Sequence, residues 1–151
     1  MSASKPTTHP LATIGYESAL QADVIQRLSS AGVEVLIDVR AVAASRRAGL
    51  SKTLLAGSLA EAGIDYLHLR DLGTPKPGRD AARKGRIAEM HAIFHNHMEE
   101  PAAQLALVKA TEVARGRRAA LLCYEADHAG CHRAILAGWI REALGCEVVN
   151  L

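Results

Sequence analysis

The chain has 151 residues, of which 49% are hydrophobic and only 3% aromatic, and its formal net charge is +2. This length favours a single domain with an aliphatic core, and the small charge does not by itself indicate nucleic-acid binding. No apolar run approaches the roughly 20 residues of a membrane span, and residues 1–10 lack the hydrophobic stretch of a signal peptide. We therefore expect a flexible tail over residues 1–10, one domain over residues 11–151 and a soluble, cytoplasmic protein.

The first half of the chain predicts strands alternating with helices. Apolar runs predict strands over residues 11–16, 33–39 and 64–69, and helices are predicted over residues 19–30 and 52–62. In the first helix, Leu20, Val24 and Leu28 repeat at four-residue spacing, which is typical of one buried helix face. Gly32 and Gly63 follow the two helices and are expected to end them.

The second half begins with a segment rich in glycine and proline, residues 70–86, which predicts a long loop. Helices are then predicted over residues 87–97 and 101–114, a strand over 119–123, a helix whose first turn holds residues 131–133, and a last strand over 146–150. Five strands that alternate with helices favour a three-layer α/β/α domain with a mostly parallel sheet.

Residues with catalytic chemistry follow two of the predicted strands. Asp38 and Arg40 come at the end of one strand, and the segment from Cys123 to Arg133 connects another strand to a helix. In parallel sheets, ligands bind at the carboxyl ends of the strands, so both groups are expected at a single site. The first turn of the helix, which offers free N–H groups, favours anions and thiolates there.

The three cysteines are an odd number in a chain that is too large to need disulfides for stability. They fit a reduced cytosolic protein in which clustered thiols are reactive or bind metal rather than form a bridge, and Cys146 is expected to be inert. In the favoured interpretation, Cys123 or Cys131 is a nucleophilic or redox thiolate. His132 and Glu125 would then act as acid/base groups, and the guanidinium of the adjacent arginine, residue 133, would clamp an oxyanion.

A metal site is the second interpretation of the same segment. Cys123, Cys131 and His132, with Glu125 or His128, could ligate zinc or iron. The cysteine spacing is not that of a standard zinc finger, and adjacent Cys131 and His132 are expected to point in different directions on a helix. The thiolate interpretation is therefore preferred.

Basic and hydroxyl side chains follow Asp38, which is expected to act catalytically by orienting a neighbour. Phosphate or another anion could be bound by the residues Arg40, Ser45, Arg46 and Lys52, although a solvated surface loop would have a similar composition. In the predicted long loop, a mobile lid over an anion or a solvated connection could be formed by Lys76, Arg79, Arg83, Lys84 and Arg86.

Several segments together resemble the DUF488 family, a group of small proteins without an established activity. The matching segments are residues 13–17, 36–40, 45–47, 66–68, 72–76, 122–125 and 131–133. The pattern C-x-E-x5-C-H-R in the last two is highly specific. The resemblance implies an α/β fold and adds Gly15, Tyr16, His68 and Lys76 to the ligand-binding candidates, beside Arg133.

These observations predict an enzyme-like domain that binds a small anionic or phosphate-bearing ligand, such as a nucleotide. Two alternatives remain at this point: a nucleic-acid- or nucleotide-binding module without catalysis, and a zinc- or iron-binding protein. The high apolar fraction with few aromatic residues is also compatible with a homodimer.

Overall fold

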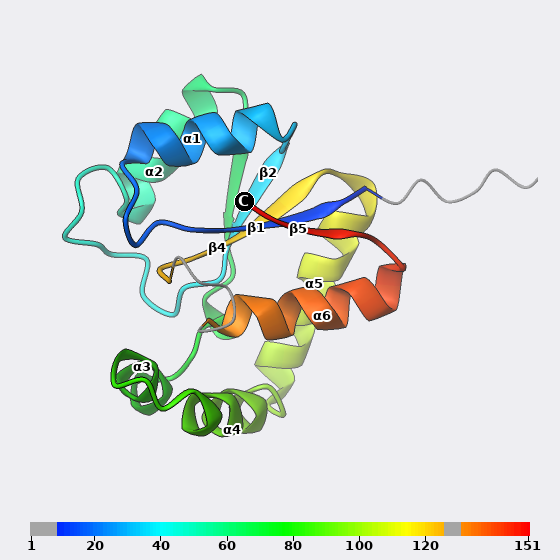
Figure 1. Cartoon of the computed structure of the whole chain (residues 1–151). Helices are drawn as coiled ribbons and strands as arrows, with labels where there is room; N and C mark the ends of the chain where they lie inside the picture. Colours follow the sequence, from blue (N-terminus) through cyan, green and yellow to red (C-terminus); the bar gives the residue numbers. More distant parts are fainter. Residues whose placement is uncertain (1–8, 126–130) are drawn as a thin grey trace, which may run out of the picture.

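A computed structural model describes residues 9–125 and 131–151, and its centre is a five-stranded, all-parallel sheet (Figure 1). The strands are β1 (Leu11–Gly15), β2 (Val35–Asp38), β3 (Asp65–His68), β4 (Ala119–Cys123) and β5 (Val148–Asn150). Their order across the sheet is β3-β2-β4-β1-β5, with β4 and β1 side by side. The chain leaves β4 and β1 toward opposite faces of the sheet. In such folds, ligands bind at the carboxyl ends of the two strands where this divergence occurs.

Helices cover both faces of the sheet. The helices α1 (Gln21–Ser30) and α2 (Lys52–Glu61) pack on one face, and α5 (Pro101–Gly116) and α6 (His132–Leu144) pack on the other (Figure 1). On the second side, α3 (Lys76–Arg83) and α4 (Ile87–His97) extend the same core. The predicted three-layer α/β/α fold is thus confirmed. Among the described residues, no helix is long and apolar enough to cross a membrane.

The position of each site residue along its strand decides on which face of the sheet its side chain lies. Leu122 packs with α1 and α2, whereas its neighbours Leu121 and Cys123 pack on the side of α5 and α6. Successive side chains of a strand point to opposite faces. On β2, Leu36 belongs to the core under α1 and α2, and Asp38, two residues later, faces that same side. The two predicted groups of site residues therefore begin on opposite faces of the sheet.

The prediction of a long loop over residues 70–86 was wrong, because this segment contains a short 3-10 turn, Arg70–Leu72, and helix α3. Proline in the first turn of α3 removes an N–H that has no partner within the helix in any case. The glycines serve close packing: a Cβ on Gly73 would lie 2.2 Å from the Ala41 backbone, and one on Gly78 would lie 2.4 Å from Thr74. The glycines here therefore reflect tight tertiary contacts, and the proline reflects the start of a helix.

Candidate functional site

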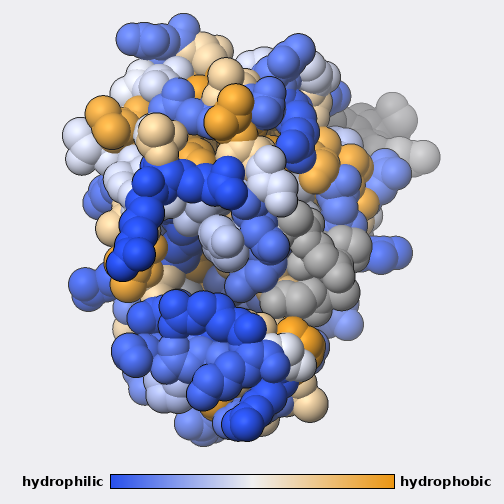
Figure 2. All heavy atoms as spheres, turned by 60° about the vertical axis from the view of Figure 1, so that its left-hand side comes forward, coloured by the Kyte–Doolittle hydropathy of each residue, from blue (hydrophilic) through white to orange (hydrophobic). Residues whose placement is uncertain are grey.

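A pocket of about 450 Å³ opens at the carboxyl ends of the central strands, between these ends and α3. Residues from both predicted groups line it, Arg40 from one and Cys123, Glu125, Cys131 and His132 from the other. Figure 2 looks onto the side of the molecule where α3 comes forward, and hydrophilic side chains gather there around a recess. The structure therefore brings the two groups to one pocket, as the strand ends predicted.

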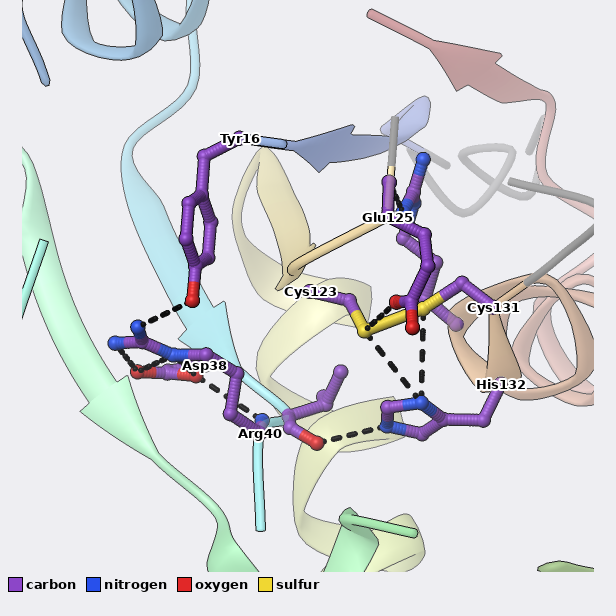
Figure 3. Close-up of a disulfide and its surroundings, with 9 residues drawn as sticks. Tyr16, Asp38, Arg40, Cys123, Glu125, Cys131 and His132 are labelled. Atoms are coloured by element: carbon purple, nitrogen blue, oxygen red, sulfur yellow. Dashed lines mark hydrogen bonds and ion pairs between the residues drawn. A yellow bond between two sulfur atoms is a disulfide. The ribbon is translucent and has the colours of Figure 1, made fainter. Parts of the chain in front are cut away.

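A disulfide joins Cys123, the last residue of β4, to Cys131, the residue that precedes the first turn of α6 (Figure 3). The expectation that the clustered cysteines are not bridged was therefore wrong. Seven residues separate them in the sequence, but the fold brings the end of β4 against the start of α6. Cys146 is a free, buried cysteine in the core on the α6 side.

The backbone of Cys131 also corrects the prediction that this residue lies in the first turn of the helix. It is the N-cap residue, with the extended torsion angles φ −129° and ψ 144°, and α6 begins at His132. The backbone changes from extended to helical between these neighbours, so the Cys131 sulfur and the His132 ring lie next to each other. The Sγ atom of Cys131 lies 3.6 Å from Nδ1 of His132.

The orientation of His132 follows from its hydrogen bond to the backbone. Its Nε2 atom lies 2.8 Å from the carbonyl oxygen of Val39, and since a carbonyl only accepts, Nε2 carries the proton. The unprotonated Nδ1 then lies 3.6 Å from Sγ of Cys123 as well as from that of Cys131 (Figure 3). Burial, with smaller contributions from the charges of Arg133 and His97, lowers the pKa of His132 to about 4. The imidazole is neutral at neutral pH.

Glu125 approaches the disulfide from the other side. Its Oε2 atom lies 3.1 Å from Sγ of Cys123, and burial raises the pKa of this carboxyl group. Arg133 is 1% exposed and donates a hydrogen bond to the backbone carbonyl of Glu125. The described residues that line the pocket do not include Arg133. In this arrangement, Arg133 holds the backbone that carries Glu125.

Asp38 and Arg40 form a buried ion pair on the other side of the pocket. Nη2 of Arg40 donates to Oδ2 of Asp38 at 2.7 Å, and Nε donates to Oδ1 at 2.9 Å. Arg40 Nη1 donates to the hydroxyl of Tyr16 at 3.1 Å and to the carbonyl of Leu50 at 2.8 Å. Tyr66 donates to Asp38 at 2.5 Å, and burial together with that carboxylate raises the pKa of Tyr66. The guanidinium of Arg40 is thus committed to protein acceptors.

Two further predicted residues support the ends of the strands. Gly15, the last residue of β1, pairs in register with Cys123 of β4. The Nε2 atom of His68 lies 2.8 Å from the carbonyl oxygen of Arg40, so His68 holds the backbone after β2. Both residues lie at the carboxyl ends of their strands, and neither is among the described residues that line the pocket.

The basic residues after Arg40 lie elsewhere. The Ser51 hydroxyl accepts from the backbone N–H of Ser45 and donates to the backbone carbonyl of the same residue. Arg46 and Lys52 are exposed, and Lys76 pairs with Asp80 on the surface. None of Ser45, Arg46, Lys52 and Lys76 is among the described residues that line the pocket.

Two arginines from α3 line the pocket instead, Arg79 and Arg83. Arg79 also donates to the carbonyl of Thr74 at 2.9 Å, and Arg83 pairs with Asp80. Their four-residue spacing, which places both on one helix face, is a signal that the sequence does contain. Because residues 70–86 were predicted to form a loop, this helical spacing was not used. His128, the other candidate metal ligand, lies outside the described residues.

A family model described as "Domain of unknown function DUF488" matches residues 21–140. The matched region contains the Asp38–Arg40 pair, α3 and both cysteines of the disulfide. No curated protein and no solved structure matches the chain.

Proposed function

The chain belongs to the DUF488 family, whose model describes a domain of unknown function, and we propose that this member is a thiol–disulfide enzyme acting on a small anionic substrate. One observation carries the proposal: the Cys123–Cys131 disulfide borders the pocket, with a carboxylate and an unprotonated imidazole nitrogen beside its sulfurs. Disulfides in reducing compartments are usually catalytic or redox-sensing, so the bridge is compatible with a cytoplasmic protein.

Cys123 is the better placed attacking thiol. Its Sγ atom has two proton acceptors, Oε2 of Glu125 at 3.1 Å and Nδ1 of His132 at 3.6 Å. Cys131 has only the imidazole nitrogen as a proton acceptor among the interactions of the described residues. As the N-cap of α6 it has a thiolate that the helix dipole stabilises, so it is the better leaving group when an incoming thiol attacks Cys123. We therefore assign attack to Cys123 and resolution to Cys131.

The reaction balances as a two-electron exchange. In the reduced protein, the Cys123 thiol passes its proton to Glu125 or His132 and attacks one sulfur of a substrate disulfide. The first substrate thiol leaves with that proton, and a mixed disulfide with Cys123 remains. The Cys131 thiol then passes its proton to Nδ1 of His132, 3.6 Å away, and attacks Sγ of Cys123; the second substrate sulfur leaves and takes up that proton as a thiol. The substrate is reduced to two thiols, the protein pair is oxidised, and the reverse sequence with a second dithiol restores it.

Anionic substrates are favoured by the wall that α3 contributes. Arg79, Arg83 and Thr74 all border the pocket. The positive charge of Arg40 is balanced by Asp38 in a buried ion pair, so it contributes little net attraction, whereas the pair of Arg83 with Asp80 is exposed to solvent and leaves Arg83 available to a ligand. The α3 arginines therefore take over the anion-binding role that the sequence suggested for Arg40, Arg46 and Arg133.

The test measures the consumption of glutathione disulfide, a small anionic disulfide, by the reduced protein. We expect wild-type protein to release two thiols per oxidised pair, Cys123→Ser to release none, and Cys131→Ser to stop at a mixed disulfide detectable by mass. Cys146→Ser, which changes the remaining cysteine, is the matched control and should react like wild type. Equal reaction of all four proteins, or no reaction of wild type, would overturn the proposal.

A further inference from the structure

We propose that the reduced site binds one zinc ion through Sγ of Cys123, Sγ of Cys131 and Nδ1 of His132. These three ligand atoms lie within 4.8 Å of one another, and all three residues are buried. Two thiolates and one imidazole are a ligand set that zinc prefers, and three protein ligands leave a fourth position open. The inference goes beyond the proposed function, because it requires the dithiol but no turnover.

The distances match a tetrahedral zinc site at two of its edges. Zinc lies about 2.3 Å from thiolate sulfur and about 2.0–2.1 Å from imidazole nitrogen, so tetrahedral angles place sulfur and nitrogen ligands about 3.6 Å apart. Nδ1 of His132 lies 3.6 Å from each of the two sulfur atoms. Only the two sulfurs must move apart, and reduction of their bond permits this.

A hydrogen bond to the backbone holds the imidazole of His132 in the tautomer and orientation that metal binding requires. The Nε2–H group of His132 donates to the carbonyl oxygen of Val39 at 2.8 Å, which leaves Nδ1 without a proton and aimed at both sulfurs. Metal-binding histidines commonly donate their second nitrogen in this way, and the partner fixes both the tautomer and the ring orientation. Phe94 packs edge-on against the same ring, with 5.1 Å between the centroids, and limits its rotation.

The sequence predicts that the side chains of adjacent Cys131 and His132 point in different directions on a helix. The extended backbone of Cys131 overturns this prediction, since the residue precedes the helix and its sulfur turns back toward the ring. The open fourth position faces the pocket that all three ligands line, where Glu125 stands 3.1 Å from Sγ of Cys123. Glu125 is the carboxylate placed to fill that position or to bond to its occupant.

Zinc binding and disulfide formation then exclude each other, because both use the same two sulfur atoms. A disulfide oxidant of the glutathione class would take two electrons from the zinc-bound thiolates, become two thiols with two protons from the solvent, and leave the protein disulfide with free Zn²⁺. Oxidation would thereby release the metal, and zinc would protect the thiols from oxidation.

The experiment titrates the reduced protein with Co²⁺ without oxygen and then displaces the cobalt with Zn²⁺. We expect sulfur-to-cobalt charge-transfer absorption that saturates at one equivalent, and loss of this absorption when glutathione disulfide is added. Cys123→Ser, Cys131→Ser and His132→Ala should each weaken binding at least about 100-fold. The matched control, Cys146→Ser, should bind like wild type, and circular dichroism reports whether each variant is folded.

The outcomes separate the two proposals. Reduced wild type that shows no charge-transfer absorption overturns the zinc site, even if it exchanges with glutathione disulfide as proposed above. One tightly bound cobalt ion in a protein that does not exchange supports the zinc site and overturns the thiol–disulfide enzyme. If His132→Ala does not fold, His132→Gln supplies the test, since it keeps a polar side chain but lacks Nδ1. Binding by a folded His132→Gln at wild-type strength contradicts the assigned ligand set.

Discussion

The two sides of the pocket are built from polar groups in different ways. On one side, Asp38 and Arg40 bond to each other and to surrounding acceptors, and every nitrogen of the guanidinium has a partner. On the other side, His132 directs an unprotonated nitrogen at two sulfurs, and Glu125 stands beside one of them. A saturated network of this kind holds the strand ends in position. A cluster with lone pairs directed at reactive sulfurs is where we expect chemistry.

The largest stability effect is expected from Asp38→Ala, because it leaves the guanidinium of Arg40 buried without its counter-ion. Removing one partner of a buried ion pair typically costs about 3–5 kcal/mol. Urea denaturation should show this loss in the free energy of unfolding, whereas Glu125→Gln, on the chemical side of the pocket, should change it by less than about 1 kcal/mol. A similar loss of unfolding free energy in both variants would contradict the proposed difference between the two sides of the pocket.

The next effect comes from pH and concerns His132, whose pKa is lowered from 6.5 to about 4 by burial. Below pH 6.5 the unfolded chain binds a proton at this residue that the folded protein does not bind. Stability should therefore fall as the pH falls from 6.5 toward 4, by about 3 kcal/mol for this group. The charged and titratable groups that act on it are Arg133, His97 and Asp38.

The matched comparison for this pH dependence is denaturation of wild type, His132→Gln and His95→Gln between pH 4 and 7. His95 is exposed on α4, so its replacement should leave the pH dependence intact. Replacement of His132 should flatten it over this interval. An identical slope in all three proteins would show that another group is responsible.

A smaller effect is expected within the network of Asp38. Tyr66→Phe removes a hydrogen bond to a buried carboxylate and should cost about 1.5–3 kcal/mol, the usual range for bonds to charged groups. Tyr16→Phe removes only an acceptor for one of several Arg40 N–H groups and should cost about 1 kcal/mol. Denaturation midpoints of the two variants test this order, and the reverse order would contradict the assigned geometry.

The smallest effect concerns the arginines of α3. Arg79→Gln and Arg83→Gln should each raise KM for glutathione disulfide by roughly 3- to 5-fold, equivalent to about 1 kcal/mol of weakened electrostatic attraction, with little change in stability. Arg46→Gln is the control, because Arg46 is exposed and is not among the described residues that line the pocket. An equal rise in KM for Arg46→Gln would indicate general charge attraction rather than a site on α3.

Local sequence patterns predicted the secondary structure well for segments that are buried in the core. The strand predicted over residues 119–123 coincides with β4, because this continuous apolar run lies in the centre of a parallel sheet. The same reasoning placed Asp38 and Cys123 at the carboxyl ends of strands. Helix α3 was missed because Gly73 and Gly78 serve contacts with Ala41 and Thr74, residues whose proximity a local pattern does not reveal.

The site required tertiary information for the same reason. The residue types around Cys123 indicated reactive chemistry, but the change of backbone at Cys131 decides whether its sulfur meets the imidazole of His132. The bond from His132 to Val39, 93 residues away, decides which nitrogen is unprotonated. Spacing along the chain cannot reveal either feature.

We expect Cys123 and Cys131 to form a reversible redox pair. The most direct measurement equilibrates Cys146→Ser protein in glutathione buffers of graded ratio and counts the free thiols at each ratio. We expect both thiols to disappear together in one two-electron transition, within the range of about −120 to −270 mV that catalytic dithiols occupy. Thiols that stay reduced throughout, or that take up glutathione separately without forming the internal bridge, would contradict this expectation.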